Sequence, residues 1–351
     1  MSLRVPVVRL RVAAVLGGVL FASSMAAPAP AREKTGSFER HEYSNDAGAR
    51  QYLLYVPSKL KKEAPLLVYL HGCTQTADDA ALGTRFNELA EERGSLVVYP
   101  EQDPNANGSR CWNWFLPEHQ HRNGGEPSII AGITTSVVDR YRANGNTVFV
   151  IGASAGGAMS ANMAASYPDL YAAAGILAAP AYTGADATGE LAYAAMGEHA
   201  RAVPTIIFQG TADLLVDYPV GRTALTQWLG TNDLADDGTR NGSVSSQPET
   251  EDRSFDQQPQ PGSGDPCIPP PSGFPCVGGI AGFQDEYPHT IERYRGSDGN
   301  VLVEFWSIHG LGHAFPYGNT EATFTDPLGP DVRTAAWEFF MAHPKAAPGD
   351  R

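Results

Sequence analysis

Five short apolar runs, separated by segments with helical spacing, most constrain the fold of this chain. The runs lie at 65–70, 96–100, 147–152, around Leu177 and at 205–208. A continuous run of about 4–8 apolar residues is typical of a strand that is buried on both faces. Helical spacing is found between the runs, at 80–92, 128–141 and 156–166. The alternation predicts an α/β domain with a mostly parallel, doubly wound sheet.

The flanking segments predict additions to this sheet. Residues 36–58 contain two extended segments around the turn signal at 45–48, which predicts a hairpin. Residues 290–294 and 301–306 predict a strand pair, and 331–342 a last helix. Before this strand pair, 231–285 is rich in Asp, Gly, Pro, Ser and Gln without periodicity, so we expect a long loop insertion that partly covers a substrate cleft. A single domain over 36–345 accommodates all of these segments.

The third apolar run leads directly into Gly152-Ala153-Ser154-Ala155-Gly156, a G-x-S-x-G motif. Such a motif between a buried strand and a helix forms a sharp turn that exposes the serine hydroxyl at the carboxyl edge of the sheet. The glycines are needed because side chains beside the serine would collide with the backbone. The pattern favours an α/β-hydrolase fold with Ser154 as a nucleophile.

A nucleophilic serine needs a base and an acid that orients it, and in this fold they follow in the order Ser, acid, His. Asp213 lies just beyond the fifth run and is preferred to Asp217, four residues later. His313 lies among glycines after the last expected strand and is preferred to His309, for which we expect a structural hydrogen bond.

Acyl transfer also needs two backbone N–H donors for the developing oxyanion. Ala155, the residue after the nucleophile, is expected to supply one of them. The loop after the first apolar run, His71 to Gln75, is expected to supply the other, from Cys73. This chemistry requires no cofactor. A metal site is not expected, because His119 and His121 lack a third ligand at a suitable spacing.

The N-terminal segment has the order of a secretory signal peptide: a basic start, an apolar run at 12–25 and then small residues. We expect residues 1–27 to be removed, with cleavage between 26 and 31. This segment carries three arginines and no acidic residue, so its removal would move the formal charge from −14 to −17. A chain this acidic argues against nucleic acid as a partner. The run falls short of the roughly 20 residues of a membrane anchor, so we expect secretion, to the periplasm or out of the cell.

Four cysteines in an exported chain indicate disulfides, and four allow three pairings. The segment between Cys267 and Cys276 is short and rich in Pro and Gly, which favours closing these two into a small loop. That leaves Cys73 and Cys111 as the second pair. The second disulfide would fix the oxyanion loop and bring residues 111–115 to the site.

The combined motifs resemble the polyhydroxybutyrate depolymerase family of esterases, which is similar to feruloyl and acetylxylan esterases. The resemblance is carried by 71–76, 111–114, 152–159, 210–213 and 310–315, and covers about 50–342. It implies a Ser154–Asp213–His313 triad, an oxyanion hole at Cys73 and Ala155, secretion, and ester substrates of the short hydroxyalkanoate or aromatic-acid type.

Two positions depart from the pattern of many relatives: Gln209 replaces histidine and Phe315 replaces tryptophan. Phe315, Trp112 and Trp114 are candidates for substrate contacts, although ordinary core packing is equally compatible with the two tryptophans. A polyester or oligoester is the expected substrate, with a carbohydrate ester as the alternative. The residues also leave open a peptidase with the same triad, or a binding protein that kept the scaffold.

Overall fold

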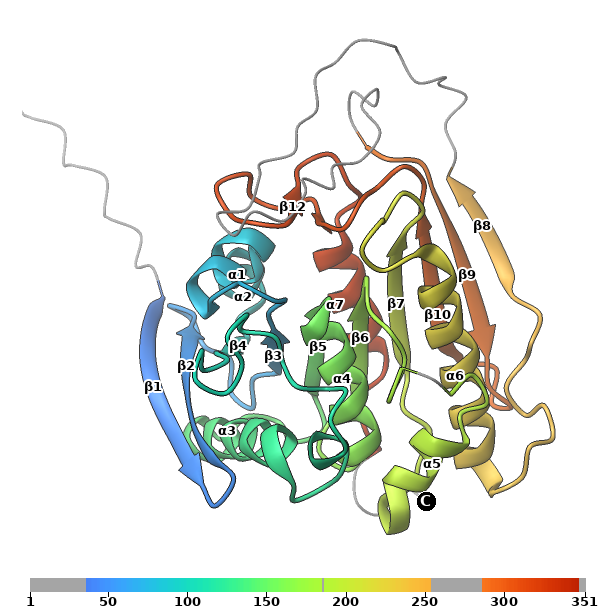
Figure 1. Ribbon diagram of the computed structural model, residues 1–351, viewed down its shortest axis with the longest axis horizontal. Coiled ribbons are helices and arrows are strands. Elements are labelled where there is room, and N and C mark those ends of the chain that lie inside the picture. Colours follow the sequence, from blue (N-terminus) through green and yellow to red (C-terminus); the bar gives the residue numbers. More distant parts are fainter. Residues whose placement is uncertain (1–35, 185, 254–285, 347–351) are drawn as a thin grey trace, which may run out of the picture. The chain divides into compact units, whose positions relative to one another are not determined.

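The computed structural model describes residues 36–184, 186–253 and 286–346. Their main feature is a ten-stranded sheet in the order β1-β2-β4-β3-β5-β6-β7-β10-β9-β8 (Figure 1). The six central strands, β4-β3-β5-β6-β7-β10, are parallel to one another. The strands at the two edges, β1 and β2 on one side and β9 and β8 on the other, pair in antiparallel fashion. The strands are β1 (Ser37–Asn45), β2 (Gly48–Val56), β3 (Leu66–Leu70), β4 (Leu96–Pro100), β5 (Val148–Ala153), β6 (Ala173–Leu177), β7 (Thr205–Gly210), β8 (Glu249–Arg253), β9 (His289–Arg295) and β10 (Val301–Ile308). The expected parallel sheet and the N-terminal hairpin are confirmed.

Helices cover both faces of this sheet and enclose two apolar cores. One core contains side chains of α3, α4, α5 and α6, and the other those of α1, α2 and α7. Figure 1 shows α4 and α6 in front of the sheet and α7 behind it. The helices are α1 (Ala77–Thr84), α2 (Phe86–Arg93), α3 (Gly125–Tyr141), α4 (Ala155–Ser166), α5 (Glu190–Met196), α6 (Tyr218–Asp237) and α7 (Val332–Ala342). The central strands are buried on both faces, which explains their uninterrupted apolar runs.

The helix expected at 80–92 is two helices, α1 and α2, that meet at Arg85. Arg85 has φ 57° and lies in the left-handed region. Gly83 and Thr84 precede it, and both are weak helix formers. A Cβ on Gly83 would lie 2.9 Å from the Thr325 side chain, so the close approach of another segment keeps this position a glycine.

The insertion expected at 231–285 begins later than predicted, because α6 continues to Asp237 and 249–253 form β8. The sequence there is polar, but two of its side chains are buried and hydrogen-bonded. Asn232 accepts from the N–H of Val203 and donates to its carbonyl, at 2.8 and 3.1 Å. Asp233 accepts from the backbone of Val244 at 3.1 Å. Residues 254–285 lie outside the described part of the chain.

The parallel strands place one end of each at a common edge, which is where side chains of distant segments meet. β3, β5, β7 and β10 end there at Leu70, Ala153, Gly210 and Ile308. Two short strands, β11 (Phe315–Pro316) and β12 (Thr325–Asp326), pair with each other beyond β10. Within the described ranges no helix is both long enough and apolar enough to cross a membrane. The expected signal peptide lies outside those ranges.

Candidate active site

Ser154 lies in the tight turn between β5 and α4. Its φ of 55° and ψ of −125° are strained for a residue with a side chain. A hydrogen bond of 2.9 Å from its N–H to the carbonyl of Leu177 joins the turn to the end of β6. A Cβ on Gly152 would lie 2.4 Å from the Gly156 backbone, and one on Gly156 would lie 1.9 Å from the Leu70 carbonyl oxygen. The two glycines therefore let β3, β5 and α4 approach closely enough to form the turn.

Asp213 follows β7 and is buried. Its Oδ1 accepts hydrogen bonds from the N–H groups of Leu215 and Val216, at 2.9 and 2.8 Å. Gln209, one of the two departures from the family pattern, donates to the Val216 carbonyl at 2.8 Å and places its amide 3.4 Å from Asp213 Oδ2. The competing acid, Asp217, is exposed at the N-terminus of α6.

His313 follows β10, and its Nδ1 lies 2.8 Å from Oδ2 of Asp213. Both side chains are buried. Since the carboxylate accepts, Nδ1 carries a proton, and Nε2 is the ring nitrogen that does not bond Asp213. His309 instead lies 2.9 Å from the hydroxyl of Thr290, through its Nε2. Burial lowers the pKa of His309.

Ser154 and His313 line the same cavity, which has a volume of about 260 Å³. No hydrogen bond joins their side chains within the described residues, as is common for catalytic pairs without a bound substrate. Most of the wall is apolar, and the cavity is lined by Tyr69, Gly72, Cys73, Thr74, Gln75, Ala80, Gly83, Thr84, Ser109, Cys111, Ala153, Ser154, Leu177, Ala178, Leu215, Val216, His313, Ala314, Phe315, Phe324 and Thr325.

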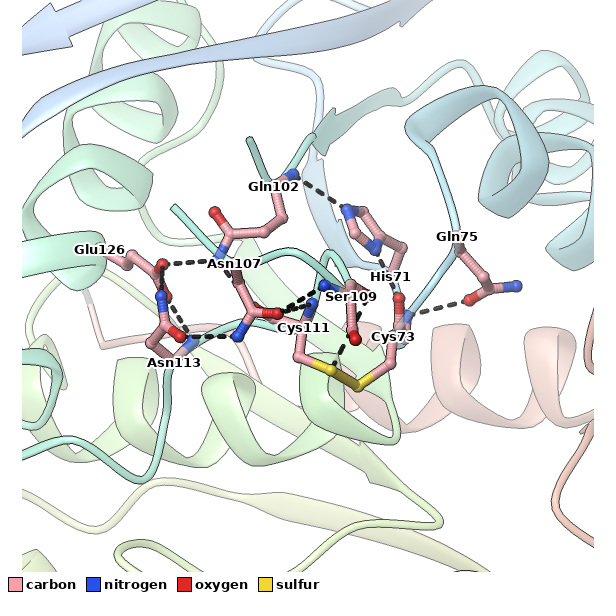
Figure 2. The surroundings of a disulfide bond; sticks show 10 residues. His71, Cys73, Gln75, Gln102, Asn107, Ser109, Cys111, Asn113 and Glu126 are labelled. Carbon is pink, nitrogen blue, oxygen red and sulfur yellow. Dashed lines mark hydrogen bonds between the residues drawn. A yellow bond between two sulfur atoms is a disulfide. The ribbon is translucent and has the colours of Figure 1, made fainter. Parts of the chain in front are cut away.

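The loop after β3 forms one side of this cavity, and a disulfide joins its Cys73 to Cys111 (Figure 2). A Cβ added to Gly72 would lie 3.4 Å from Cβ of Ser154, so the loop passes close to the serine. Among the loop and turn hydrogen bonds of the described residues, none is donated by the N–H of Cys73 or of Ala155. The two N–H groups remain the predicted donors to an oxyanion. Cys267 and Cys276 lie outside the described residues.

Of the predicted substrate contacts, Phe315 lines the cavity and the two tryptophans do not. Trp112 is fully buried in the core beside His71, with ring centroids 5.6 Å apart, so it is not a cavity wall. Trp114 is half-buried and also does not line the cavity. Phe315 does, and it packs edge-on against Tyr69 and Phe86. The disulfide places Cys111 at the cavity wall, but the side chain of Trp112 lies in the core.

Sequence reasoning missed several wall residues, including Tyr69, Leu215 and Phe324. Leu214 and Leu215 carried a usable signal, since two large apolar residues directly follow the predicted acid. They are 76% and 44% exposed, which is unusual for leucine beside a polar loop. Phe324 carried no such signal, because its segment has no periodicity. The described residues contain no group of three or more potential metal ligands.

The chain is similar to known proteins in both sequence and fold. Residues 50–227 match the family described as Esterase PHB depolymerase. Poly(3-hydroxyalkanoate) depolymerase C of Paucimonas lemoignei is 28% identical over 274 residues, which cover 78% of this chain and 60% of that protein. Acetylxylan esterase A of Talaromyces purpureogenus is 38% identical over 131 residues, which cover 37% of this chain and 33% of that protein. The chain thus spans less than two thirds of either relative.

A solved structure with a similar fold is an acetyl xylan esterase from Aspergillus awamori. It superimposes with a TM-score of 0.56 at 22% identity and covers 78% of this chain and 94% of its own. At this level of identity the similarity concerns the fold alone. Together with the sheet order, it supports the α/β-hydrolase fold that the sequence predicted.

Proposed function

This chain belongs to the Esterase PHB depolymerase family, and we propose that it is a serine hydrolase of carboxylic esters with Ser154 as its nucleophile. The observation that carries the proposal is the contact between His313 Nδ1 and Asp213 Oδ2 beside the cavity that Ser154 also lines. A serine on a strained turn, a histidine and a buried carboxylate are the parts of a catalytic triad.

The reaction is a two-step acyl transfer. His313 accepts the proton of the Ser154 hydroxyl as the oxygen attacks the ester carbonyl, and Asp213 orients the imidazole. The N–H groups of Cys73 and Ala155 stabilise the oxyanion. His313 then protonates the leaving alcohol, and water releases the acid from the acyl-enzyme by the same steps.

The substrate we propose is a short-chain hydroxyalkanoate polyester or its oligomers. The longest similarity supports it, because the Paucimonas relative, matched over 78% of this chain, is named a poly(3-hydroxyalkanoate) depolymerase. The apolar cavity suits a short aliphatic acyl group. The higher identity to an acetylxylan esterase over a shorter segment favours a carbohydrate ester as the second candidate.

We propose that the enzyme acts after secretion. The basic and apolar order of residues 1–27 supports a cleaved signal peptide. The disulfide between Cys73 and Cys111 supports an oxidising compartment, where such bonds persist.

The test is hydrolysis by the purified protein and its Ser154→Ala variant on four substrates. These are a hydroxybutyrate oligomer, amorphous polyhydroxybutyrate, acetylated xylan and methyl ferulate. Serine-dependent release of hydroxybutyrate is the expected result. Turnover of acetylated xylan or ferulate alone would move the protein to the carbohydrate esterases, and hydrolysis that survives Ser154→Ala would contradict the serine mechanism.

A further inference from the structure

The peptide unit between Gly72 and Cys73 is held by a buried histidine. Nδ1 of His71 lies 2.7 Å from the carbonyl oxygen of Gly72 (Figure 2). The N–H of Gln75 reaches the same oxygen at 3.4 Å, and the Gln75 side chain accepts from the N–H of Gly72 at 2.9 Å. The carbonyl of this peptide unit is therefore fixed on the side away from the solvent.

This fixation has a direct consequence for the N–H of Cys73. A trans peptide is planar, and its C=O and N–H point in opposite directions. Holding the Gly72 carbonyl against His71 therefore directs the Cys73 N–H the other way. Cys73 lines the cavity that contains Ser154, and a Cβ added to Gly72 would lie 3.4 Å from Cβ of Ser154, so this peptide unit lies near the serine. The direction of the oxyanion donor is thus set by the opposite end of its own peptide unit.

The hydrogen bonds of His71 define which nitrogen carries its proton. The backbone N–H of Gln102 lies 3.0 Å from Nε2, and an N–H can only donate. Nε2 must accept this bond, so the proton is on Nδ1 and points to the Gly72 carbonyl. His71 is 1% exposed, and burial lowers its pKa, which keeps the ring in this neutral form.

A second connection links Gln102 to Cys73 through Cys111. The Gln102 side chain donates to the Cys111 carbonyl at 2.8 Å, and Cys111 is bonded to Cys73. Gln102 also contacts the buried carboxylate of Glu126, which accepts from the Asn113 backbone at 2.7 Å (Figure 2). The residues on both sides of the disulfide are therefore attached to one buried polar network.

We propose that His71 is a positioning residue of the ester hydrolysis: its Nδ1–H holds the Gly72 carbonyl and so directs the Cys73 N–H toward the oxyanion. The inference rests on the proposed function. His71 contributes to the reaction in the transition state, where the oxyanion exists, and not in substrate binding. Loss of one such donor costs about 10²–10³ in kcat in related sites, and a misdirected donor loses part of that.

Two variants separate the two hydrogen bonds of His71. His71→Asn places an amide N–H near the position of Nδ1 and keeps the bond to Gly72, but loses the acceptor for Gln102. His71→Gln places an acceptor near the position of Nε2 and keeps the bond to Gln102, but loses the donor to Gly72. Each variant loses one hydrogen bond of the same buried side chain, so their effects on stability are matched.

The measurements are kcat and KM on nitrophenyl acetate and the Ki of a trifluoromethyl ketone, which forms a tetrahedral oxyanion with the serine. Active sites are titrated with a fluorophosphonate, so that kcat refers to the folded fraction. We expect His71→Gln to lower kcat about 10- to 100-fold with KM unchanged, and to raise Ki by the same factor. His71→Asn is expected to stay within about threefold of the wild type.

Equal losses in the two variants, or a larger loss in His71→Asn, would overturn the positioning role. A rise in KM that is matched by an equal rise in Ki would also overturn the positioning role, because that pattern indicates a general distortion of the site. Ser154→Ala is measured in the same series. If hydrolysis did not depend on Ser154, the proposed function would fail, and the role of His71 with it. Serine-dependent hydrolysis with unaltered His71→Gln kinetics would remove only the present inference.

Discussion

His313 and Asp213 are 100 residues apart in the chain, yet Nδ1 of the one lies 2.8 Å from Oδ2 of the other. They meet because β7 and β10 are parallel neighbours, with Gly210 opposite Ile308, so the loops after both strands leave the sheet at the same edge. The other carboxylate oxygen accepts two backbone N–H groups, which fixes the plane of the carboxylate toward the ring.

This geometry predicts different results for two neighbouring acids. Asp213→Asn removes the acceptor that holds the proton on Nδ1 of His313, so the ring can adopt the wrong tautomer. We expect kcat on nitrophenyl acetate to fall by roughly 10⁴-fold, as in triads of this type.

Asp217→Asn is the matched control. Asp217 is exposed and makes no capping hydrogen bond with its side chain. The kcat of this variant is expected to remain within about twofold of the wild type, because substitutions of exposed residues usually have small effects. A loss in Asp217→Asn as large as that in Asp213→Asn would refute the assignment of the acid.

A second prediction concerns the turn that carries Ser154. Gly156→Ala would place a Cβ 1.9 Å from the Leu70 carbonyl oxygen and 2.5 Å from its carbon. Both are backbone atoms of a central strand, so β3 and α4 would have to separate. We expect the free energy of unfolding to fall by about 3 kcal/mol or the protein not to fold. Gly145→Ala is the control, since nothing lies within 4 Å of the point that its Cβ would occupy. Urea unfolding distinguishes them, and equal stability of the two variants would contradict the steric argument.

The triad candidates could be predicted from the sequence because each is anchored to a local pattern. Ser154 lies in a motif at the end of an apolar run, Asp213 follows another run, and His313 lies among glycines after the last strand. The orientation of Trp112 could not be predicted in this way. It depends on the packing of its loop against His71 and the α3–α4 core, which involves residues that are distant in the sequence.

The same distinction explains the errors in the fold. No helix was predicted at 218–237, and the insertion was expected to begin at 231, because Asn232 and Asp233 have the composition of a loop. Their partners, Val203 and Val244, lie in other segments. The break at Arg85 was missed because helical spacing continues across it. The buried strands were found because their signal is contained within a few consecutive residues.

A third prediction concerns Leu215, which lines the cavity although its side chain is 44% exposed. Leu215→Ser should weaken contacts with a longer acyl chain while leaving the backbone N–H that binds Asp213 in place. We expect KM for nitrophenyl butyrate to rise about 3- to 10-fold, with little change for nitrophenyl acetate.

The control for this prediction is Leu191→Ser, on α5, where the leucine is 51% exposed but does not line the cavity. It should leave both KM values unchanged. A parallel rise for acetate and butyrate in Leu215→Ser would show that the residue does not contact the acyl chain.

A fourth prediction concerns the pH dependence of stability near β12. Burial raises the pKa of Asp326 from its ordinary value of 3.8, although its carboxylate accepts from Leu328 N–H and the Tyr287 hydroxyl, both at 2.9 Å. The folded protein therefore holds this proton to a higher pH than the unfolded chain does. Between 3.8 and the raised value, the free energy of unfolding falls as the pH rises.

Asp326→Asn removes that titration and the buried charge. The variant should be at least as stable as the wild type at pH 7, and the difference in the free energy of unfolding should shrink toward zero as the pH falls below about 4.

Asp298→Asn should show the opposite pH dependence of stability, because the backbone N–H and side chain of Asn300 lower the pKa of Asp298. The stability that Asp298 contributes is present at neutral pH and is lost as the pH falls through its lowered pKa. Urea unfolding of the three proteins from about pH 2 to 7 measures both slopes. A constant difference between the wild type and Asp326→Asn over this range would show that folding does not raise the pKa of Asp326.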